Sequence, residues 1–225
     1  MNTSKPTIKI CGIRTIPMVV SLGTLAIDDI GFVFASGKRT VTPEFAGTMI
    51  KALRLTGSFA RAVGVFVNPS MDILAETLKA APLDVIQLHG QESPEFCKEV
   101  KQRFNGITIC KVYGMKNEEN QLNIASQLNP YQGYCDSILL DTHDPHIGGG
   151  TGEAFAWNRI PAYQDWAKEV GIPLIVAGGL NPDNVGELIK SYKPDGVDVS
   201  SGVERDGTKD ILLIKAFIER VRQND

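Results

Sequence analysis

"AVGVFVNPSMDILAETLKAAPLDVIQLHG", residues 62–90, holds two short apolar runs separated by a segment with helical periodicity. The runs AVGVFV (62–67) and DVIQL (84–88) contain several β-branched residues and have the length of buried strands. Between them, MDILAETLKAA (71–81) repeats its apolar side chains at helical spacing. A strand, a helix and a second strand in this order predict two parallel strands joined by a right-handed crossover.

This unit recurs along the whole chain. Eight strand-sized runs occur, at residues 7–11, 29–34, 62–67, 84–88, 108–112, 137–141, 173–177 and 196–200. Their starts are about 27 residues apart on average, enough for a strand, a turn and a helix. Several intervening segments begin with Ser, Thr or Asn followed by Pro, which is typical of a helix start. A final helix is expected at about 209–222.

The repetition predicts an α/β fold, namely a (β/α)8 TIM barrel with a closed parallel sheet of eight strands. A doubly wound open sheet is the competing architecture, and it would need a Gly-x-Gly-x-x-Gly turn after an early strand. The sequence contains no such turn and no linker or low-complexity stretch. We therefore expect residues 1–225 to form a single domain.

Composition narrows the possible functions. Of the 225 residues, 43% are hydrophobic and 22% are charged, which is ordinary for a globular protein. The net charge of −3 and the lack of a basic run argue against a nucleic-acid partner. The apolar runs are much shorter than the ~20 residues that a membrane helix needs. The N-terminus MNTSKPTIKI has no apolar signal core, which predicts a cytoplasmic protein.

Cysteines and histidines give no sign of a metal site. The four cysteines are scattered and form no Cys-x-x-Cys pair, which favours free thiols in a cytoplasmic chain. They are Cys11, Cys97, Cys110 and Cys135. The three histidines (His89, His143 and His146) are too few for a multi-histidine metal cage. We therefore expect neither a metal ion nor a cofactor.

The active face of such a barrel lies at the carboxyl ends of its strands. Two neighbouring strand ends are rich in glycine and serine, at AGGLN (177–181) and SSGVE (200–204). Glycine lets backbone N–H groups approach an anion, and a helix start in GLNPDN (179–184) would add a favourable dipole. These ends predict a phosphate cradle, although each could instead be a simple turn. Its expected members are Gly178, Gly179, Ser200, Ser201 and Gly202.

Asp141 ends the run SILLD (137–141) and precedes a glycine-rich loop, GGGTG (148–152). Alternation places Leu139 and Asp141 on one face of the strand. A carboxyl group at a partly dry barrel mouth can stay protonated near neutrality and act as a general acid. Capping of a turn is the alternative role for this aspartate.

Cys11 ends the first strand, where alternation places it on the same face as Lys9. A buried lysine beside the thiol is expected to lower the thiol pKa from its ordinary ~8.5 and to supply a thiolate base. The alternative is a small buried hydrophobic residue. Lys9 would itself need an anionic partner, and Asp198 on the adjoining eighth strand is the candidate. Arg39, after the second strand, is either a clamp for a carboxylate or a solvated charge.

A family resemblance rests on motifs at seven of the eight strand ends. They are KICGIR, GFVFASGKRTV, GVFVN, DVIQLHG, LLDT…GGTGEAFAW, IVAGGLNPDNV and GVDVSSGVERDGTKD. In this order they resemble the phosphoribosylanthranilate isomerases of tryptophan biosynthesis. The resemblance implies a cofactor-free Amadori rearrangement of N-(5-phosphoribosyl)anthranilate to 1-(2-carboxyphenylamino)-1-deoxyribulose 5-phosphate. The enzyme would be a monomer or a homodimer.

By this resemblance Asp141 is the general acid and Cys11 is the general base. The predicted cradle would bind the phosphate of the substrate, and Arg39 would bind the anthranilate carboxylate. Asp198, the expected partner of Lys9, is also a candidate substrate-binding residue. Gly149 and Gly150 would belong to a loop that closes over the sugar. Two alternatives remain at this point: the related phosphoribosyl isomerase of histidine biosynthesis, and a non-catalytic barrel that binds a sugar phosphate.

Overall fold

The computed structural model describes residues 5–114, 124–141 and 157–224. Eight parallel strands close into a barrel in sequence order, with β1 paired to both β2 and β8. This confirms the predicted TIM barrel and each of its eight strands. The strands are β1 (Thr7–Cys11), β2 (Asp29–Val33), β3 (Arg61–Phe66), β4 (Val85–Leu88), β5 (Thr108–Gly114), β6 (Ser137–Asp141), β7 (Leu174–Ala177) and β8 (Gly196–Val199).

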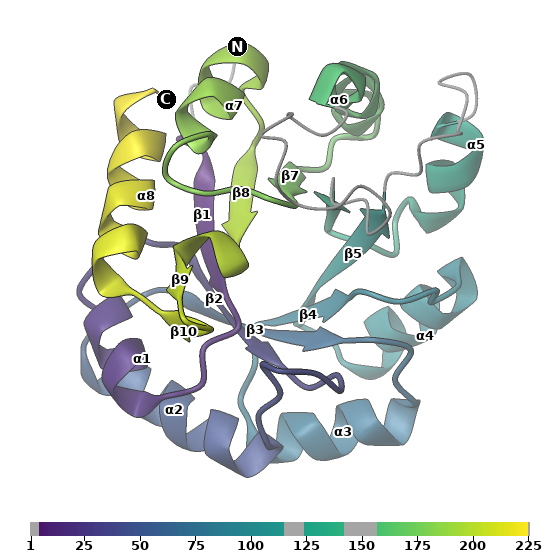
Figure 1. Ribbon diagram of the computed structural model, residues 1–225. Helices are drawn as coiled ribbons and strands as arrows, with labels where there is room; N and C mark the ends of the chain where they lie inside the picture. Colours follow the sequence, from purple (N-terminus) through teal and green to yellow (C-terminus); the bar gives the residue numbers. More distant parts are fainter. Residues whose placement is uncertain (1–4, 115–123, 142–156, 225) are drawn as a thin grey trace.

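The α-helices lie outside the ring of strands (Figure 1). They are α1 (Ile16–Leu22), α2 (Pro43–Leu55), α3 (Met71–Ala80), α4 (Pro94–Arg103), α5 (Ile124–Leu128), α6 (Ile160–Val170), α7 (Val185–Tyr192) and α8 (Ile211–Gln223). Thr42, Ser70 and Ser93 each accept a backbone N–H from the third residue of the helix that follows. These caps satisfy a donor that the first helical turn would otherwise leave unpaired.

Helix α7 begins later than the sequence predicted. The side chain of Asn181 accepts the backbone N–H groups of Asp183 (2.8 Å) and Asn184 (3.2 Å), and Asn184 Oδ1 accepts the N–H of Asn181 (2.9 Å). These bonds close a turn in which asparagine side chains stand in for backbone partners. The helix start expected in GLNPDN therefore lies at Val185 instead.

Alternation along the strands separates two apolar layers. Ile8 and Ile10 of β1, like Ile138 and Leu140 of β6, belong to the large core cluster that includes the buried helix side chains. Leu139 belongs to the second cluster, which fills the barrel interior. The other members of that interior cluster are Val63, Val85, Cys110, Val112, Ile175 and Ala177. The face that the sequence predicted Leu139 and Asp141 to share is therefore the inner one, where Leu139 packs in the interior and Asp141 lines the pocket described below.

A buried ion pair joins the first and last strands. Lys9 lies opposite Asp198 in the register of β1 and β8, and its Nζ lies 2.8 Å from Asp198 Oδ2. Both side chains are less than a tenth exposed. Although burial alone lowers the pKa of Lys9, the carboxylate of Asp198 raises it above its ordinary value, so the lysine is charged. The partner expected for Lys9 is confirmed.

Three small elements after β8 were not predicted. A 3-10 turn, η4 (Ser201–Val203), leads into a hairpin of β9 (Glu204–Arg205) and β10 (Thr208–Lys209). Asp206 and Gly207 form the hairpin turn with φ values of +51° and +71°. An Asp-Gly pair is a strong sequence signal for such a turn, so the hairpin could have been predicted from these two residues.

No helix in the described ranges is both long enough and apolar enough to cross a membrane.

Candidate active site

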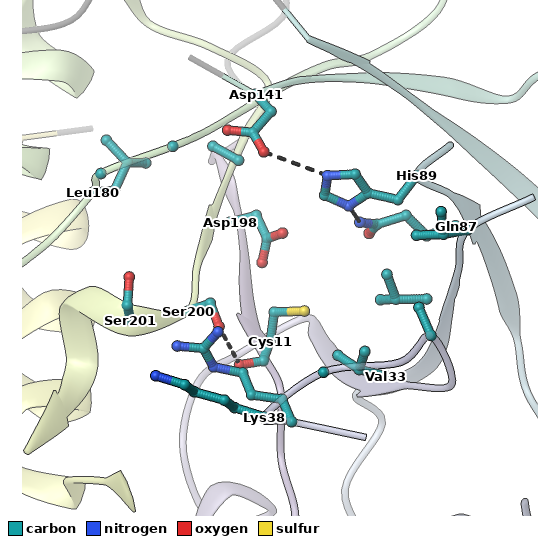
Figure 2. A pocket seen from close by; sticks show the side chains of 18 of the residues that line it. Cys11, Val33, Lys38, Gln87, His89, Asp141, Leu180, Asp198, Ser200 and Ser201 are labelled. Carbon is teal, nitrogen blue, oxygen red and sulfur yellow. Dashed lines mark hydrogen bonds and ion pairs between the residues drawn. The ribbon is translucent and has the colours of Figure 1, made fainter. Parts of the chain in front are cut away.

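A pocket of about 380 Å³ opens at the carboxyl ends of the strands. Eight of the residues predicted from the sequence line it: Cys11, Arg39, Asp141, Gly178, Gly179, Asp198, Ser200 and Ser201. Figure 2 shows Cys11 and Asp141 approaching this space from different sides, with Asp198 between them. Gly149 and Gly150 lie outside the described residues, as do Thr151 and His143. The structure therefore brings both proposed catalytic groups to one cavity.

Cys11 lies at the rim of β1, and only 8% of the residue is exposed. Space for its sulfur comes from Gly31 on β2, where an added Cβ would lie 2.7 Å from Sγ. The carbonyl oxygen of Cys11 accepts a 3.2 Å hydrogen bond from Ser200 Oγ. The thiol is thus held between β2 and the loop after β8.

The pKa of the Cys11 thiol corrects one expectation. Burial raises this pKa above its ordinary value, and it outweighs the opposing effect of Lys9. Asp198 adds to the rise. Lys9 lowers the thiol pKa as predicted, but the net shift is upward because the effect of burial is larger and the carboxylate of Asp198 acts in the same direction as burial.

Asp141 ends β6, and its Oδ2 lies 3.4 Å from Nε2 of His89. The other ring nitrogen, Nδ1, lies 3.4 Å from Nε2 of Gln87 (Figure 2). If the Gln87 amide donates, Nδ1 is the acceptor and the ring proton lies on Nε2, facing Asp141. The sequence placed His89 at a strand end but did not assign it to the site.

Asp198 lines the pocket and, within the described part of the chain, has one unpaired carboxylate oxygen. Its Oδ2 accepts the hydrogen bond of Lys9, whereas Oδ1 is buried and has no hydrogen-bond partner among the described residues. A buried, unpaired carboxylate oxygen is costly unless a ligand donates to it. Asp198 is therefore suited to accept a hydrogen bond from a hydroxyl group of a substrate.

The glycine-rich ends of β7 and β8 meet at one side of the pocket. Gly178 and Gly179 have φ values of +92° and +63°, in the left-handed region that glycine adopts without strain. Gly202 is not in the pocket lining, and a Cβ there would lie 1.8 Å from the carbonyl oxygen of Leu180. Gly202 thus lets η4 pack against the loop after β7, which places Ser200 and Ser201 beside the two glycines.

Arg39 lines the pocket from the loop after β2. Its Nε and Nη2 donate to the two carboxylate oxygens of Glu204, each over 2.7 Å. The side chain of Arg39 is one third exposed, whereas that of Glu204 is 9% exposed. Arg39 is therefore not simply solvated. Glu204, which holds it, was not singled out from the sequence.

Among the described residues no three His, Cys, Asp or Glu side chains are grouped so that they could hold a metal ion. All four cysteines are buried free thiols. The titratable side chains in the described pocket lining are those of Cys11, Lys38, Arg39, His89, Asp141 and Asp198.

Comparisons with known proteins identify the family of this chain. The family described as N-(5'-phosphoribosyl)anthranilate (PRA) isomerase matches residues 8–220. A Brevibacillus brevis protein named N-(5'-phosphoribosyl)anthranilate isomerase is 44% identical over 218 residues, covering 97% of this chain and 94% of the relative. The crystal structure of phosphoribosyl anthranilate isomerase from Thermotoga maritima is 36% identical with a TM-score of 0.80, covering 97% of this chain and 99% of the other.

A further solved structure is phosphoribosyl anthranilate isomerase in complex with reduced 1-(o-carboxyphenylamino)-1-deoxyribulose 5-phosphate. It is 33% identical with a TM-score of 0.77, and the match covers 97% of this chain and 99% of that one. The family match spans most of the chain, and the relatives cover nearly all of it. This chain belongs to the N-(5'-phosphoribosyl)anthranilate isomerase family.

Proposed function

We propose that this protein is an enzyme that isomerises N-(5-phosphoribosyl)anthranilate to 1-(2-carboxyphenylamino)-1-deoxyribulose 5-phosphate, a step of tryptophan biosynthesis. The observation that carries the proposal is that Cys11 and Asp141 line one pocket, next to the glycine and serine residues at the ends of β7 and β8. A base, an acid and an anion site around one cavity are what an Amadori rearrangement of a sugar phosphate requires.

Asp141 acts first, as the general acid. Its carboxyl group donates a proton to the ring oxygen of the aminosugar, the C1–O bond breaks, and the nitrogen lone pair forms a protonated Schiff base with C1. The ring oxygen becomes a hydroxyl group and Asp141 becomes a carboxylate. The ring N–H of His89, on the tautomer described above, would face this carboxylate.

Cys11 acts next, as the general base. In its thiolate form, which the charge of Lys9 favours against the effect of burial, Cys11 removes the proton from C2. The electron pair of that C–H bond forms a C1–C2 double bond while the nitrogen regains its lone pair. The resulting enolamine becomes the ketone when C1 takes the proton now held by the Cys11 thiol and the C2 hydroxyl group gives its proton to the Asp141 carboxylate. Both side chains return to their starting states, so the net reaction is an isomerisation.

The substrate is held at both ends. Gly178, Gly179, Ser200 and Ser201 surround the phosphate, with Gly202 packed behind them, because glycine and serine at strand ends present donors to an anion. Arg39 binds the anthranilate carboxylate through its planar guanidinium. Asp198 Oδ1 accepts a hydrogen bond from a sugar hydroxyl. Gly149 and Gly150 remain predicted contacts of the loop after β6.

The proposal extends to the setting of the enzyme. The whole chain acts as one domain in the cytoplasm, as a monomer or a homodimer, on a small phosphorylated aminosugar.

A coupled fluorescence assay of phosphoribosylanthranilate consumption tests the function. Wild type is expected to convert the substrate, and Cys11→Ala and Asp141→Asn are each expected to lower kcat by about 10²–10⁴-fold, because each removes one proton transfer. Circular dichroism of both variants provides the control for folding. A folded wild type that does not convert the substrate, and does not complement a tryptophan auxotroph lacking this step, would favour the non-catalytic barrel.

A further inference from the structure

Two charged residues of the hairpin after β8 lie behind the pocket rather than in its lining. Glu204 of β9 and Lys209 of β10 are adjacent across the hairpin, and Lys209 Nζ lies 2.5 Å from Glu204 Oε1. Their side chains are 9% and 5% exposed. Burial lowers the pKa of Lys209 and Glu204 opposes that shift, so the two charges depend on each other. A buried ion pair contributes little to the net free energy of folding, because desolvation of both charges offsets their attraction. Glu204 and Lys209 are therefore candidates for a role in the site.

Glu204 binds only one edge of the Arg39 guanidinium. Its carboxylate accepts hydrogen bonds from Nε–H and from one N–H of Nη2, which together form the side edge of that group. The edge formed by Nη1 and Nη2 makes no hydrogen bond to any described residue. A guanidinium has two edges that match a carboxylate, so Glu204 fills one and leaves the other for a second carboxylate.

The stem of Arg39 is fixed as well. It crosses Gly12, where an added Cβ would lie 2.5 Å from Arg39 Cδ. Arg14 joins the loop of Arg39 to the hairpin, because its Nη1 and Nη2 donate to the carbonyl oxygens of Lys38 (2.9 Å) and Gly207 (2.7 Å). The direction of the guanidinium is therefore set by the hairpin.

The hydrogen bonds continue to the other end of the site. Lys209 Nζ donates to the carbonyl oxygen of Ser200 over 2.9 Å and to its Oγ over 3.3 Å. The same Oγ donates to the carbonyl oxygen of Cys11. A glutamine at residue 204 still offers an amide oxygen that can accept a hydrogen bond from Lys209, so the Glu204→Gln variant is expected to keep the Lys209 contacts with Ser200.

We propose that Glu204 is a positioning residue for substrate recognition: it fixes Arg39 so that the Nη1–Nη2 edge meets the carboxylate of the substrate. This rests on the proposed function. The hydrogen bonds of Arg39 also hold the pKa of Glu204 at about 2, so the pair is charged throughout the working pH range.

Charge alone predicts the opposite effect, which makes the proposal testable by its sign. Removing the negative charge of Glu204 leaves Arg39 and Lys209 as uncompensated cations, and simple attraction would then favour an anionic substrate. Loss of positioning weakens binding of the same substrate. The direction of the change in KM therefore separates the two roles.

The test compares two substrates in wild type, Glu204→Gln and Asp206→Asn. One substrate is N-(5-phosphoribosyl)anthranilate, and the other is N-(5-phosphoribosyl)aniline, which lacks the carboxylate. For Glu204→Gln, kcat/KM on the anthranilate is expected to fall about 10–100-fold through KM, the equivalent of one charge-assisted contact. For the aniline substrate, kcat/KM of Glu204→Gln is expected to stay within about 3-fold of the wild-type value, a difference of less than one such contact. Asp206, exposed in the same hairpin, is the matched control, and its variant is expected to match wild type on both substrates.

A double-mutant cycle completes the test. If Glu204 acts through Arg39, adding Glu204→Gln to the Arg39→Ala variant causes no further fall in kcat/KM for the anthranilate substrate. An equal loss on both substrates, an unchanged KM or a lower KM would overturn the proposal. If Glu204→Gln does not fold, Glu204→Asp replaces it, with the same substrate-specific loss expected because the shorter acid cannot span both nitrogens. A wild type that converts neither substrate would instead refute the proposed function.

Discussion

The side of the pocket that carries Cys11 is built differently from the side that carries Asp141. Cys11 is almost fully buried, beside the Lys9–Asp198 ion pair and against the bare Cα of Gly31. The Asp141 side chain is 26% exposed, and its contact with His89 spans 3.4 Å to a ring that is 37% exposed. The thiol base is thus buried in the wall of the pocket, whereas the carboxyl acid is partly exposed to solvent at its opening.

The difference follows from what each group has to do. Burial raises the pKa of the thiol, and Lys9 partly offsets this rise by favouring the thiolate. The residues around Cys11 therefore have to stabilise a buried thiolate that water cannot reach. A substitution that alters the packing or the charge there is expected to cost more free energy than one at an exposed site. At the rim, water can solvate the acid in either state. We expect variants on the Cys11 side to have the larger effects.

Lys9→Met is expected to have the largest effect. It leaves the buried Asp198 carboxylate without its partner, which should lower the free energy of unfolding by about 3–5 kcal/mol. It also removes the cation that favours the thiolate, so the thiol pKa of Cys11 should rise further. Urea denaturation measures the first effect, and the pH dependence of thiolate absorbance, relative to Cys11→Ser in the same background, measures the second.

The double variant Lys9→Met, Asp198→Leu is the control for the ion pair. Replacing both charges with apolar side chains should recover most of the stability, because the desolvation cost disappears together with the attraction. Activity should stay low, since the hydroxyl acceptor at residue 198 is lost. An unchanged thiol pKa in Lys9→Met would contradict the role given to the lysine.

A pair of glycine variants compares the two sides directly and should have a smaller effect on stability. Gly31→Ala would place a Cβ 2.7 Å from Cys11 Sγ, so the thiol must move. We expect kcat to fall by about 10²-fold and the free energy of unfolding to fall by about 1–3 kcal/mol. Steady-state kinetics and urea denaturation measure these changes.

Gly114→Ala is the matched control on the side of the acid. Gly114 pairs with Asp141 in the register of β5 and β6, and an added Cβ there meets no atom of the described residues within 4 Å. Activity should stay near wild type, and stability should change by no more than about 0.5 kcal/mol. Equal losses in both variants would mean that the packing around Cys11 has no special importance.

Much of the fold and part of the site could be predicted because they depend on local pattern. The β-branched runs located all eight strands, and alternation placed Lys9 with Cys11 and Leu139 with Asp141 on shared strand faces. Closure of a barrel makes the first and last strands neighbours, which identified Asp198 as the partner of Lys9. Each of these steps needs only strand periodicity and the order of the strands.

The rest depends on depth and on contacts between distant segments. The net pKa shift of Cys11 is a balance between burial and charge, and a sequence does not give the depth of burial. Glu204 meets Arg39 across 165 residues through a hairpin that was not predicted. His89 was placed at a strand end, but its contact with Asp141 depends on the side-chain rotamer. The sequence contains Glu204 and His89, but their roles depend on three-dimensional contacts that no local sequence pattern encodes.

A crystal structure of this protein with reduced 1-(o-carboxyphenylamino)-1-deoxyribulose 5-phosphate tests the central claim most directly. If Cys11 and Asp141 act on one sugar, Cys11 Sγ should lie within about 3.5 Å of C2, and an Asp141 carboxylate oxygen should lie within about 3.2 Å of the hydroxyl oxygen that comes from the opened ring. The phosphate should lie against Gly178, Gly179, Ser200 and Ser201. A fully bound ligand that reaches only one of the two catalytic groups would contradict the account.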